Sequence, residues 1–571
     1  MCGIVGVLGT HEVAPLIVEA LKRLEYRGYD SAGIATVNAG RLDRRRAVGK
    51  LVNLSDLLVH DPLPGKSGIG HTRWATHGGV TVPNAHPHRS GPVAVVHNGI
   101  IENFRDLRDE LTAKGLPFES ETDTESVAVL ARSFLDAGQT PLQAVQNTVA
   151  RLRGAFALCF LFDGLDDLMI GARHGAPLAV GHGSGENYIG SDALALAPMT
   201  DRISYLEDGD VALVTRKAVA IFDHKGHPAN RAVVQVALDQ TRIDKAGYKH
   251  FMAKEIAEQP VVIADALAHA ITGDALNLPA EVDFTGVDRL ALIACGTGHY
   301  ACAVAKYWFE GLAGLPCDVD IASEFRYRDP VLSPASWAVF VSQSGETADT
   351  LAALRHATGK VARTLGIVNV PTSSIAREAA FALPIRAGVE VGVASTKAFT
   401  AQLVTLALLA LKAARDRGRM DDATLATQLA ALTALPGLMN HTLGLASGIA
   451  QIAEDLATAQ DILFLGRGPM FPLAMEGALK LKEISYIHAE GYASGELKHG
   501  PIALIDAAVP VIVLAPSDAL FDKTVSNMQE VMARNGRVLL ISDARGIASA
   551  GAGCWRTLTL PEVSPLLAPI L

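Results

Sequence analysis

Hydrophobic and polar positions divide the chain into two parts with different patterns. Up to residue 238, short apolar runs alternate with turns rich in Gly, Asn and Asp, which predicts a layered α+β domain. Its predicted strands are residues 3–8, 92–97, 155–162 and 211–215. From residue 251 on, apolar runs are followed by helical stretches, and this alternation is typical of a parallel sheet covered by helices.

The second part contains two blocks with the same outline. Strands are predicted at 289–295, 337–342, 364–370 and 381–385 in the first block, and at 461–465, 510–514 and 537–541 in the second. A glycine follows the first strand of each block, Gly296 in one and Gly466 in the other. This repeat predicts a duplicated α/β unit. The predicted division is a domain over 1–238, a linker and leading helix over 239–280, α/β units over 281–420 and 459–571, and a helical connection over 421–458.

One stretch is apolar enough to raise the question of a membrane span. The mean hydropathy of the chain is +0.24, and the best candidate span is residues 399–414. That run contains Gln402 and Lys412 and is shorter than the roughly 20 residues that cross a bilayer, so it predicts a buried helix. The N-terminus has no basic segment before its apolar run, so no signal peptide is predicted. We expect a cytoplasmic protein with no membrane partner.

Charge and cysteine content exclude further classes. Acidic residues outnumber basic ones by 60 to 50 among 571 residues, which gives a net charge of −10. Because no broad basic field exists, nucleic acid is not expected as a partner. The densest basic run, residues 41–46, is predicted to be a solvated turn. The six cysteines form no CxxC pair, so neither a zinc site nor a disulfide framework is predicted. No metal or organic cofactor is implied.

Cys2 is the first candidate for chemistry. Removal of Met1 would make Cys2 the N-terminal residue, and its α-amine, with a pKa of about 8, could then take the proton of the thiol. On its own, this cysteine is equally well explained as a small buried residue.

Polar residues elsewhere in the first domain favour a catalytic site. Arg73 can bind a carboxylate with two hydrogen bonds, and Asp123 can hold an ammonium group. The side-chain amide of Asn98 and the N–H of Gly99 can stabilise an oxyanion. Together with a thiol nucleophile, they describe a pocket for an amino acid with an acyl side chain. The alternatives are a surface ion pair for Arg73, a hairpin turn at Asn98-Gly99 and a helix cap at Asp123.

Four motifs of this part resemble the glutaminase domain of class II, or N-terminal-nucleophile, amidotransferases. They are CGIVG at 2–6, YRGYDSAG at 26–33, HTRWATHG at 71–78 and HNGIIEN at 97–103. The resemblance implies an αββα fold and the hydrolysis of L-glutamine to glutamate and ammonia. It also implies a thioester on Cys2, an oxyanion hole from Asn98 and Gly99, and an ammonia gate at Trp74. The residues that it implies for glutamine binding are Arg73, Thr76, His77 and Asp123.

The first α/β unit offers an anion site. The motif SQSGET at 342–347 lies between a predicted strand and a predicted helix at 347–358, where hydroxyls and free N–H groups suit a phosphate monoester. Thr297, Ser395 and Thr396 also follow strands of the same predicted sheet, and ligands bind at that edge of parallel sheets. The alternative for each hydroxyl is an ordinary helix cap.

The second unit offers groups for proton transfer. A helix predicted over 475–489 carries Lys480, Glu483 and His488, and His499 follows it. A carboxylate and a histidine suit proton transfers on a sugar. The alternative is an ordinary Lys480–Glu483 pair on a solvated helix face.

Motifs in both parts resemble glutamine–fructose-6-phosphate aminotransferases of the isomerising type. They lie at 248–256, 342–350, 392–400, 479–488 and 495–501, in addition to those of the first domain. The resemblance implies two sugar-isomerase (SIS) domains and ammonia channelled to fructose 6-phosphate. The product would be glucosamine 6-phosphate, in the first step of amino-sugar biosynthesis. It also implies a homodimer through the SIS domains.

The same resemblance implies the roles of the sugar-site residues. Glu483 would move a proton between C1 and C2, Lys480 would lie beside the sugar, and His499 of the neighbouring subunit would assist ring opening. The residues implied to hold the sugar phosphate are Thr297, Ser342, Gln343, Ser344 and Thr347.

Two departures from the family pattern stand out. Gly298 occupies a position that is usually Ser. The chain also stops before the last helix and polar tail of the family, including a lysine that attacks the open-chain sugar, so we expect a truncated second SIS domain and an impaired synthase. The end, residues 563–571, carries no charge and is apolar, and we expect Leu566, Leu567, Ile570 and Leu571 to lack their cover.

Other functions are open to a chain with these motifs. Asparagine synthetase would need an SGGxDS-type loop and amidophosphoribosyltransferase an acidic pyrophosphate loop, and the chain contains neither. A sugar-phosphate sensor that binds without turnover is the alternative from another class. The intact set of Cys2, Arg73, Asn98 and Asp123 argues against the sensor, and the early stop argues for it.

Overall fold

The computed structural model describes residues 2–25, 28, 30–236 and 245–571. It contains two compact units, Met1–Asp244 and Lys245–Leu571, which are described separately below. Part of the YRGYDSAG motif, at residues 26, 27 and 29, lies outside the described residues, as does the predicted linker from 239 to 244.

The first unit is a sandwich of two antiparallel sheets. One sheet has eight strands in the order β14-β11-β9-β10-β1-β4-β2-β3, and the other has six in the order β13-β12-β8-β7-β6-β5. The strands of the first sheet are β1 (Gly3–Leu8), β2 (Ser31–Asn38), β3 (Arg41–Val48), β4 (Ser67–Arg73), β9 (Ala179–His182), β10 (Asn187–Gly190), β11 (Arg202–Tyr205) and β14 (Val234–Gln235). Those of the second are β5 (His88–Ser90), β6 (Val93–Ile101), β7 (Gly154–Phe162), β8 (Met169–His174), β12 (Val211–Val214) and β13 (Val219–Phe222).

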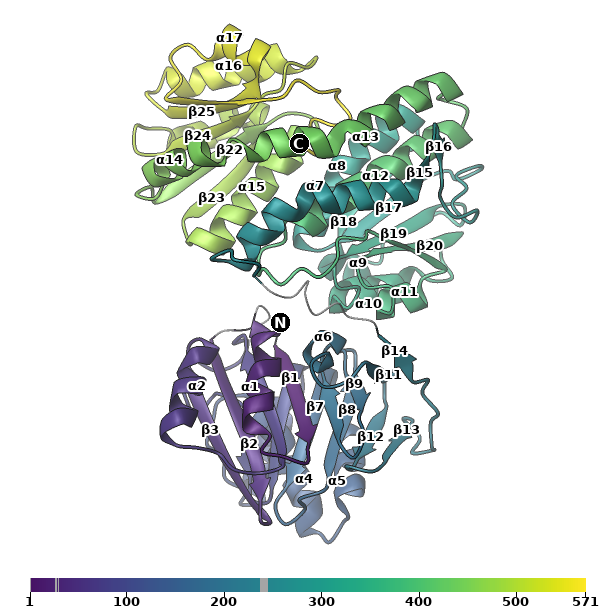
Figure 1. Ribbon diagram of the computed structural model, residues 1–571, viewed down its shortest axis with the longest axis vertical. Coiled ribbons are helices and arrows are strands. Elements are labelled where there is room, and N and C mark those ends of the chain that lie inside the picture. Colours follow the sequence, from purple (N-terminus) through teal and green to yellow (C-terminus); the bar gives the residue numbers. More distant parts are fainter. Residues whose placement is uncertain (1, 26–27, 29, 237–244) are drawn as a thin grey trace. The chain divides into compact units, whose positions relative to one another are not determined.

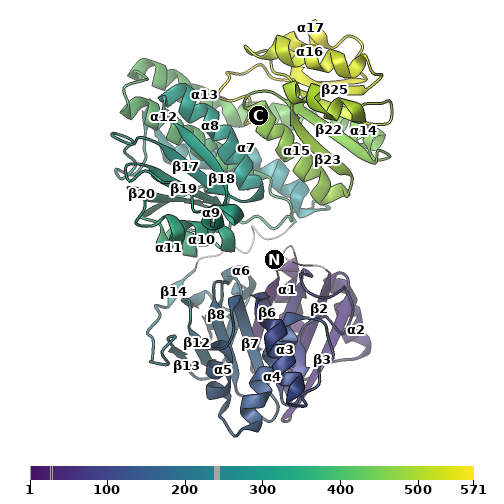
Figure 2. The same ribbon diagram turned by 180° about the vertical axis from the view of Figure 1, so that it is seen from behind.

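Helices cover the two outer faces, as Figures 1 and 2 show from opposite sides. They are α1 (Ala14–Lys22), α2 (Leu51–His60) and α6 (Ala193–Leu196) on the larger sheet, and α3 (Phe104–Ala113), α4 (Asp123–Asp136) and α5 (Pro141–Val149) on the smaller. Alternation along β1 explains the layers, because Ile4 packs between the sheets while Val5 packs under α1. The predicted αββα fold is therefore confirmed.

The basic run at 41–46 corrects one prediction. These residues form strand β3, paired along its length with β2, and not a solvated turn. Leu42 is buried between the sheets, while Arg45 pairs with Asp61 at the edge of the sheet. Ion pairs and strand pairing thus allow adjacent arginines in an edge strand.

The second unit contains two parallel five-stranded sheets of the same topology, with strand orders β18-β17-β19-β20-β21 and β23-β22-β24-β25-β26. The predicted duplication is therefore confirmed. The first half comprises α7 (Phe251–Ala270), β15 (Ile271–Thr272), β16 (Ala275–Leu276), β17 (Leu290–Ala294), α8 (Gly296–Ala313), β18 (Cys317–Ile321), α9 (Ala322–Arg328), β19 (Trp337–Ser342), α10 (Ala348–Ala357), β20 (Arg363–Val368), α11 (Ser374–Glu378), β21 (Phe381–Pro384), α12 (Lys397–Asp416), α13 (Asp422–Leu443) and α14 (Ala446–Leu456).

The second half begins at β22 (Asp461–Gly466) and α15 (Met470–Ser485). The remaining elements are β23 (His488–Ala493), the 3₁₀ helices η3 (Ser494–His499) and η4 (Pro501–Leu504), β24 (Pro510–Leu514), α16 (Phe521–Met532), β25 (Arg537–Asp543), α17 (Ala544–Ala550) and β26 (Arg556–Leu560). The helix predicted over 475–489 thus ends earlier, because Tyr486 is left-handed with φ 61°, and His488 begins a strand.

Helix α12 corresponds to the apolar stretch at 399–414. It is the one described helix with the length and composition of a membrane span, and 83% of its apolar window is buried inside the protein. It packs on α8 in the core of the first half, together with Leu292 and Val339 of the sheet. The prediction of a buried core helix is confirmed.

The apolar end of the chain corrects another expectation. Leu566, Leu567 and Ile570 are buried, and they join the same core cluster as α12 and α13 of the first half. These side chains do not lack cover, because the segment after β26 runs back to the first half of the unit. Their burial therefore contributes to the stability of this unit.

Candidate functional site

Cys2 lies directly before β1. Because β1 pairs with β4, with Gly3 opposite Thr72, Cys2 is placed beside Trp74. The N–H of Trp74 donates to Cys2 Sγ at 3.3 Å. Burial raises the pKa of the Cys2 thiol, against the opposing influence of this N–H and of the Arg73 charge. The cysteine is half-buried, and it needs a base to become a nucleophile.

Arg73 is held by the loop that follows it. Its guanidinium donates to the carbonyl oxygens of His77 at 2.5 Å, Gly78 at 3.1 Å and Gly79 at 3.2 Å. These bonds fix a buried cation at one side of the pocket. The alternative of a surface ion pair for Arg73 is therefore wrong.

Asp123 is the first residue of α4. The cap of this helix is Thr122, whose hydroxyl accepts from the N–H of Glu125, so the alternative of a cap at Asp123 is wrong. One oxygen of the Asp123 carboxylate accepts from the N–H of Ile101 at 2.9 Å. The buried carboxylate is thus fixed at the N-terminus of the helix, where the backbone favours negative charge.

Asn98 and Gly99 belong to strand β6 and pair with β7, so they are not a hairpin turn. The side-chain Nδ2 of Asn98 donates to the carbonyl oxygen of Cys2 at 3.0 Å. Gly99 has φ +126°, and a Cβ there would lie 2.0 Å from the carbonyl oxygen of Ala155. Glycine is therefore required at this position.

Except for Asn98, which is joined to the site through its bond to the Cys2 carbonyl oxygen, these residues line one small pocket of the first unit. The space in it that a water molecule could occupy is about 10 Å³, enough for about one water. Trp74, with 41% of its surface exposed, lies at the pocket. The predicted residues that line it are Cys2, Arg73, Trp74, Thr76, His77, Gly99 and Asp123.

The predicted phosphate loop lies at the carboxyl end of β19, where the order of the first parallel sheet reverses between β17 and β19. The hydroxyl of Ser342 lies 2.9 Å from that of Thr347 and accepts from the N–H of Gly345 at 3.0 Å. The carbonyl oxygen of Gln343 accepts from the N–H of Asn369, and Ser344 accepts from the N–H of Glu346. The loop is thus tied into a fixed shape at the start of α10.

Thr297 is the second residue of α8 and contacts α15. Its hydroxyl donates to Glu476 at 3.0 Å and accepts from Lys480 at 3.0 Å. The ammonium of Lys480 also lies 2.5 Å from Glu483. Thr297, Lys480 and Glu483 therefore form one network between the two halves of the unit. The predicted Lys480–Glu483 pair is formed, with Lys480 half-buried and Glu483 exposed.

Two predicted histidines do not join this network in the described chain. His488, in β23, is exposed and bonds with Asp461 at 2.9 Å. His499 is exposed at the end of η3, and within the described residues no hydrogen bond or ion pair connects it to Lys480 or Glu483. Ser395, another hydroxyl considered for phosphate, donates instead to Glu390 at 2.9 Å.

Comparison with known proteins gives a consistent family. A model described as a glutamine amidotransferase domain matches residues 83–198, and the SIS domain matches residues 283–412 and 455–569. Relatives from Brucella abortus and Zymomonas mobilis, both called glutamine–fructose-6-phosphate aminotransferase (isomerizing), are 57% and 55% identical to this chain. Each alignment spans 574 residues, which is 100% of this chain and 95% of the relative.

The chain belongs to the glutamine–fructose-6-phosphate aminotransferase family. A solved structure, the C-terminal domain of glucosamine-fructose-6-phosphate aminotransferase from Francisella tularensis, has 43% identity and a TM-score of 0.56. The match covers 57% of this chain and 93% of the solved domain. The predicted resemblance, the glutaminase fold followed by SIS domains, and the interpretation as an enzyme are confirmed, so the sensor alternative is not supported.

Sequence analysis missed two parts of the aminotransferase site. Glu476 is buried beside Lys480, and burial raises its pKa to about 7 against the opposing influence of Lys480 and Thr297. Its spacing to Lys480 and Glu483, four and seven residues, places all three on one helix face and was a usable signal. The other part is a set of buried histidines at the thiol pocket, His71, His86, His88 and His97, of which His86 and His97 line the pocket itself.

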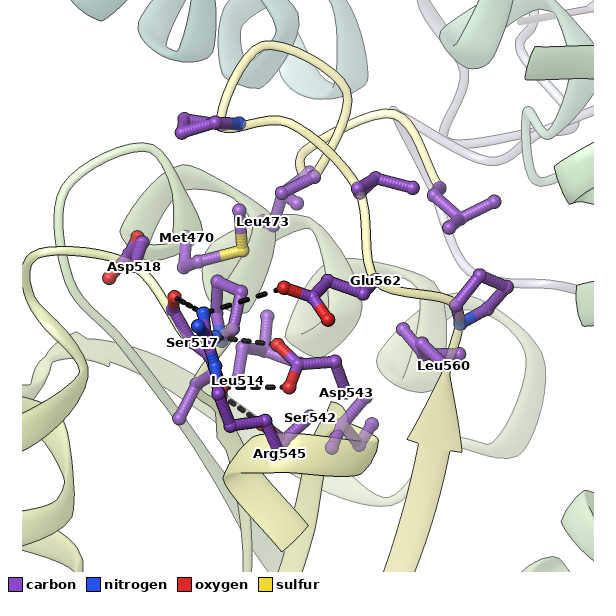
Figure 3. Close-up of a pocket in the computed structure, with 18 residues that line it drawn as sticks. Met470, Leu473, Leu514, Ser517, Asp518, Ser542, Asp543, Arg545, Leu560 and Glu562 are labelled. Atoms are coloured by element: carbon purple, nitrogen blue, oxygen red, sulfur yellow. Dashed lines mark hydrogen bonds and ion pairs between the residues drawn. The ribbon is translucent and has the colours of Figure 1, made fainter. Parts of the chain in front are cut away.

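A larger cavity of about 410 Å³ lies at the carboxyl edge of the second SIS sheet (Figure 3). None of the predicted site residues lines it. Asp543 accepts from the N–H and hydroxyl of Ser517 at 2.8 and 2.7 Å, and Arg545 is paired with Glu562 at 3.6 Å. Although burial acts to raise it, the hydrogen bonds from Gly546 and Ser517 hold the pKa of Asp543 below its usual value. A charged carboxylate at the end of β25 therefore bonds with the loop after β24, which is the counterpart of the hydroxyl loop after β19 in the first sheet.

Proposed function

We propose that this chain transfers the amide nitrogen of L-glutamine to fructose 6-phosphate and forms glucosamine 6-phosphate. The observation that carries the proposal is the presence of two sites in one chain. One is a thiol pocket with a fixed cation and carboxylate, and the other is a hydroxyl loop in the same unit as a Lys–Glu network. The identity to the named aminotransferases over the whole chain supports the same function.

In the first half-reaction, Cys2 is the nucleophile. Its thiol gives a proton to its own α-amine after loss of Met1, and the sulfur attacks the amide carbon of glutamine. Arg73 binds the α-carboxylate and Asp123 the α-ammonium, while Thr76 and His77 line the pocket. Asn98 and Gly99 stabilise the oxyanion. Ammonia leaves, and water then hydrolyses the thioester to glutamate and regenerates the thiol.

Trp74 is proposed as the gate for the ammonia that leaves Cys2. Its side chain is partly exposed, Trp74 lines the pocket, and its backbone N–H contacts the nucleophile. A residue in contact with Cys2 can respond to the thioester, which gives a physical route for gating.

In the second half-reaction, ammonia attacks C2 of fructose 6-phosphate and water is lost, which gives an imine. Glu483 then takes a proton from C1 and returns it to C2, while the proton of the C1 hydroxyl passes to the imine nitrogen, so that C1 becomes an aldehyde and C2 carries the amine. Lys480 lies between Glu483 and Glu476 and can stabilise charge on the oxygen at C1. We add Glu476 to the predicted residues as a neighbour that sets the position of Lys480.

The sugar phosphate is assigned to the first SIS domain. Ser342, Gln343, Ser344 and Thr347 form its loop after β19, and Thr297 lies at the next strand end. The equivalent loop after β24 of the second domain carries Ser517 against a charged Asp543, which repels a phosphate. Electrostatics therefore favour the first of two sites that share one topology.

We further propose a cytoplasmic homodimer that forms through the SIS domains. His499 is exposed, and no hydrogen bond or ion pair connects it to Glu483 among the described residues. We therefore assign it to the sugar site of the neighbouring subunit. The exposed position of His499 supports this arrangement.

The function is tested by measuring both products of one reaction mixture. With glutamine and fructose 6-phosphate present, we expect glucosamine 6-phosphate to form and every molecule of it to be matched by at least one glutamate. Glutamine alone should still give glutamate. Glutamate without amino sugar, no glutamate at all, or amino sugar in excess of glutamate would contradict the proposal.

A further inference from the structure

His71 contacts the amide of Asn98 on the side away from Cys2. It lies on β4, is fully buried, and comes from the strand that pairs with β1. Its Nε2 lies 3.1 Å from Asn98 Oδ1 and 2.9 Å from the carbonyl oxygen of His97. Asn98 is thus held between His71 and the Cys2 carbonyl oxygen, which its Nδ2 contacts at 3.0 Å.

The direction of each hydrogen bond follows from the chemistry of the partners. The carbonyl oxygen of Cys2 can only accept, so the amide nitrogen of Asn98 must face it and donate. The amide oxygen of Asn98 then faces His71, and both it and the carbonyl oxygen of His97 can only accept. Nε2 of His71 must therefore carry the hydrogen and donate to both.

The surroundings keep His71 in this state. Burial lowers its pKa to about 3, so the ring is neutral at physiological pH. Its face stacks on His86 with ring centroids 4.1 Å apart, and its Nδ1 has no hydrogen-bond partner among the described residues. The one hydrogen of the neutral ring is thus committed to Nε2, on the side of Asn98.

We propose that His71 is a positioning residue for glutamine hydrolysis, whose Nε2–H fixes the Asn98 amide with its N–H groups toward Cys2. The proposal rests on the role of Asn98 as an oxyanion donor. If the amide rotated by half a turn, its NH₂ group would face the donor of His71, and its oxygen would face the developing oxyanion. Both contacts are repulsive, so His71 selects the productive orientation before substrate binds.

The test is a double-mutant cycle on the full chain. His71→Met removes the donor and keeps an apolar side chain, and His71→Gln keeps an N–H near the place of Nε2. We expect His71→Met to lower kcat for glutamine hydrolysis about 10- to 100-fold, with KM changed less than about threefold. His71→Gln should restore most of that loss.

Asn98→Ala provides the second side of the cycle. Alone it should lower kcat about 100- to 1,000-fold, and in that background His71→Met should change kcat less than about twofold. His88→Met is the matched control, because His88 is also buried but contacts Thr122 and not Asn98. Its effect should be as large with Ala at position 98 as with Asn.

The outcomes distinguish a failure of the positioning role of His71 from a failure of the proposed function. An equal loss from His71→Met in both backgrounds, or no recovery in His71→Gln, would overturn the positioning role. If His71→Met does not fold, the comparison of His71→Gln with the shorter His71→Asn decides, and equal activities would overturn the proposal. Unchanged kcat in Asn98→Ala would remove the oxyanion role and this proposal with it, while continued hydrolysis in Cys2→Ala would instead refute the proposed function.

Discussion

At the scale of single residues, two groups have their reactivity set by their surroundings. The pairing of β1 with β4 brings Cys2 to Trp74, and the stacking of the two sheets brings it to Asn98. Glu476 is buried beside Lys480 and Thr297. For both groups, burial disfavours the charged form and raises the pKa, whereas hydrogen bonds and nearby positive charges act to lower the pKa.

Cys2→Ala should abolish glutamine hydrolysis, with a loss of at least about a thousandfold, because no other thiol lines the pocket among the described residues. A chain that retains Met1 should be equally inactive, because its α-amine is then a peptide N–H. A glutamine-like electrophile should label the parent chain once, as mass spectrometry would show. Cys554→Ala, a change in the other unit, should leave labelling intact, and labelling of the Cys2→Ala chain would contradict the mechanism.

Glu476 should make the stability of the second unit depend on pH. Its folded pKa of about 7 is above the value near 4.5 of a free glutamate, so protonation stabilises the fold. The contribution is complete below pH 4.5 and is lost as pH rises through 7, with a total of about 3 kcal/mol.

Thermal unfolding of the second unit between pH 4 and 8 measures this effect. Glu476→Gln is neutral at every pH, so its unfolding temperature should fall less as the pH rises from 4 to 8. Thr297→Val removes a hydrogen bond that lowers the pKa of Glu476, so the loss of stability should occur at higher pH in this variant. The same slope in the parent chain and in Glu476→Gln would show that other groups cause it.

At the scale of elements, two loops of the same topology have different chemistry. The loop after β19 presents hydroxyls that bond with one another, and the loop after β24 bonds with a charged carboxylate. The small pocket of the glutaminase unit is formed by Cys2 just before β1, Arg73 at the end of β4 and Gly99 within β6. Function therefore follows from the residues at strand ends, which the shared fold presents in the same way in both halves.

Thr347→Ala should weaken binding of fructose 6-phosphate about 10- to 100-fold, because a hydrogen bond to a charged group contributes about 1.5–3 kcal/mol. Titration calorimetry with fructose 6-phosphate measures the dissociation constant of each variant. Ser517→Ala, at the equivalent loop of the second SIS domain, is the matched control and should bind normally. Equal weakening in both variants would mean that the first loop is not the phosphate site. Glutamine hydrolysis measured without sugar should be the same in the parent chain and in both variants.

At the scale of the whole molecule, the proposed dimer makes a quantitative prediction about mixed subunits. Glu483→Gln and His499→Ala should each be inactive in amino-sugar formation when pure. If His499 acts on the neighbouring subunit, a mixed dimer contains one site with both native residues, so co-expression should restore activity to about a quarter of the parent chain for random pairing. Size-exclusion chromatography should give the mass of a dimer. Mixed chains that stay inactive would place both residues in the same subunit.

The amino-acid sequence by itself determined the class of each unit and most of the chemistry. Strands such as residues 510–514 and the helix that became α12 follow from local runs of apolar residues, and these need no knowledge of the rest of the fold. The glutaminase and phosphate-loop motifs are contiguous, so their residue types and spacing are readable directly. The turn predicted at 41–46 failed because the ion pairs that permit a basic strand are formed with distant residues.

The tertiary structure alone decided which residues meet. Thr297 and Lys480 are 183 positions apart, and only the packing of α8 on α15 joins them. Cys2 and Asn98 are 96 positions apart and belong to different sheets, so only the stacking of the two sheets joins them. The same holds for His71, whose donor direction depends on three neighbours, and for Glu476, whose pKa depends on burial. Burial of Leu566 and Ile570 against the first SIS half is likewise a long-range contact. Local patterns fix elements because they depend on neighbours in sequence, whereas hydrogen-bond partners and pKa values depend on neighbours in space.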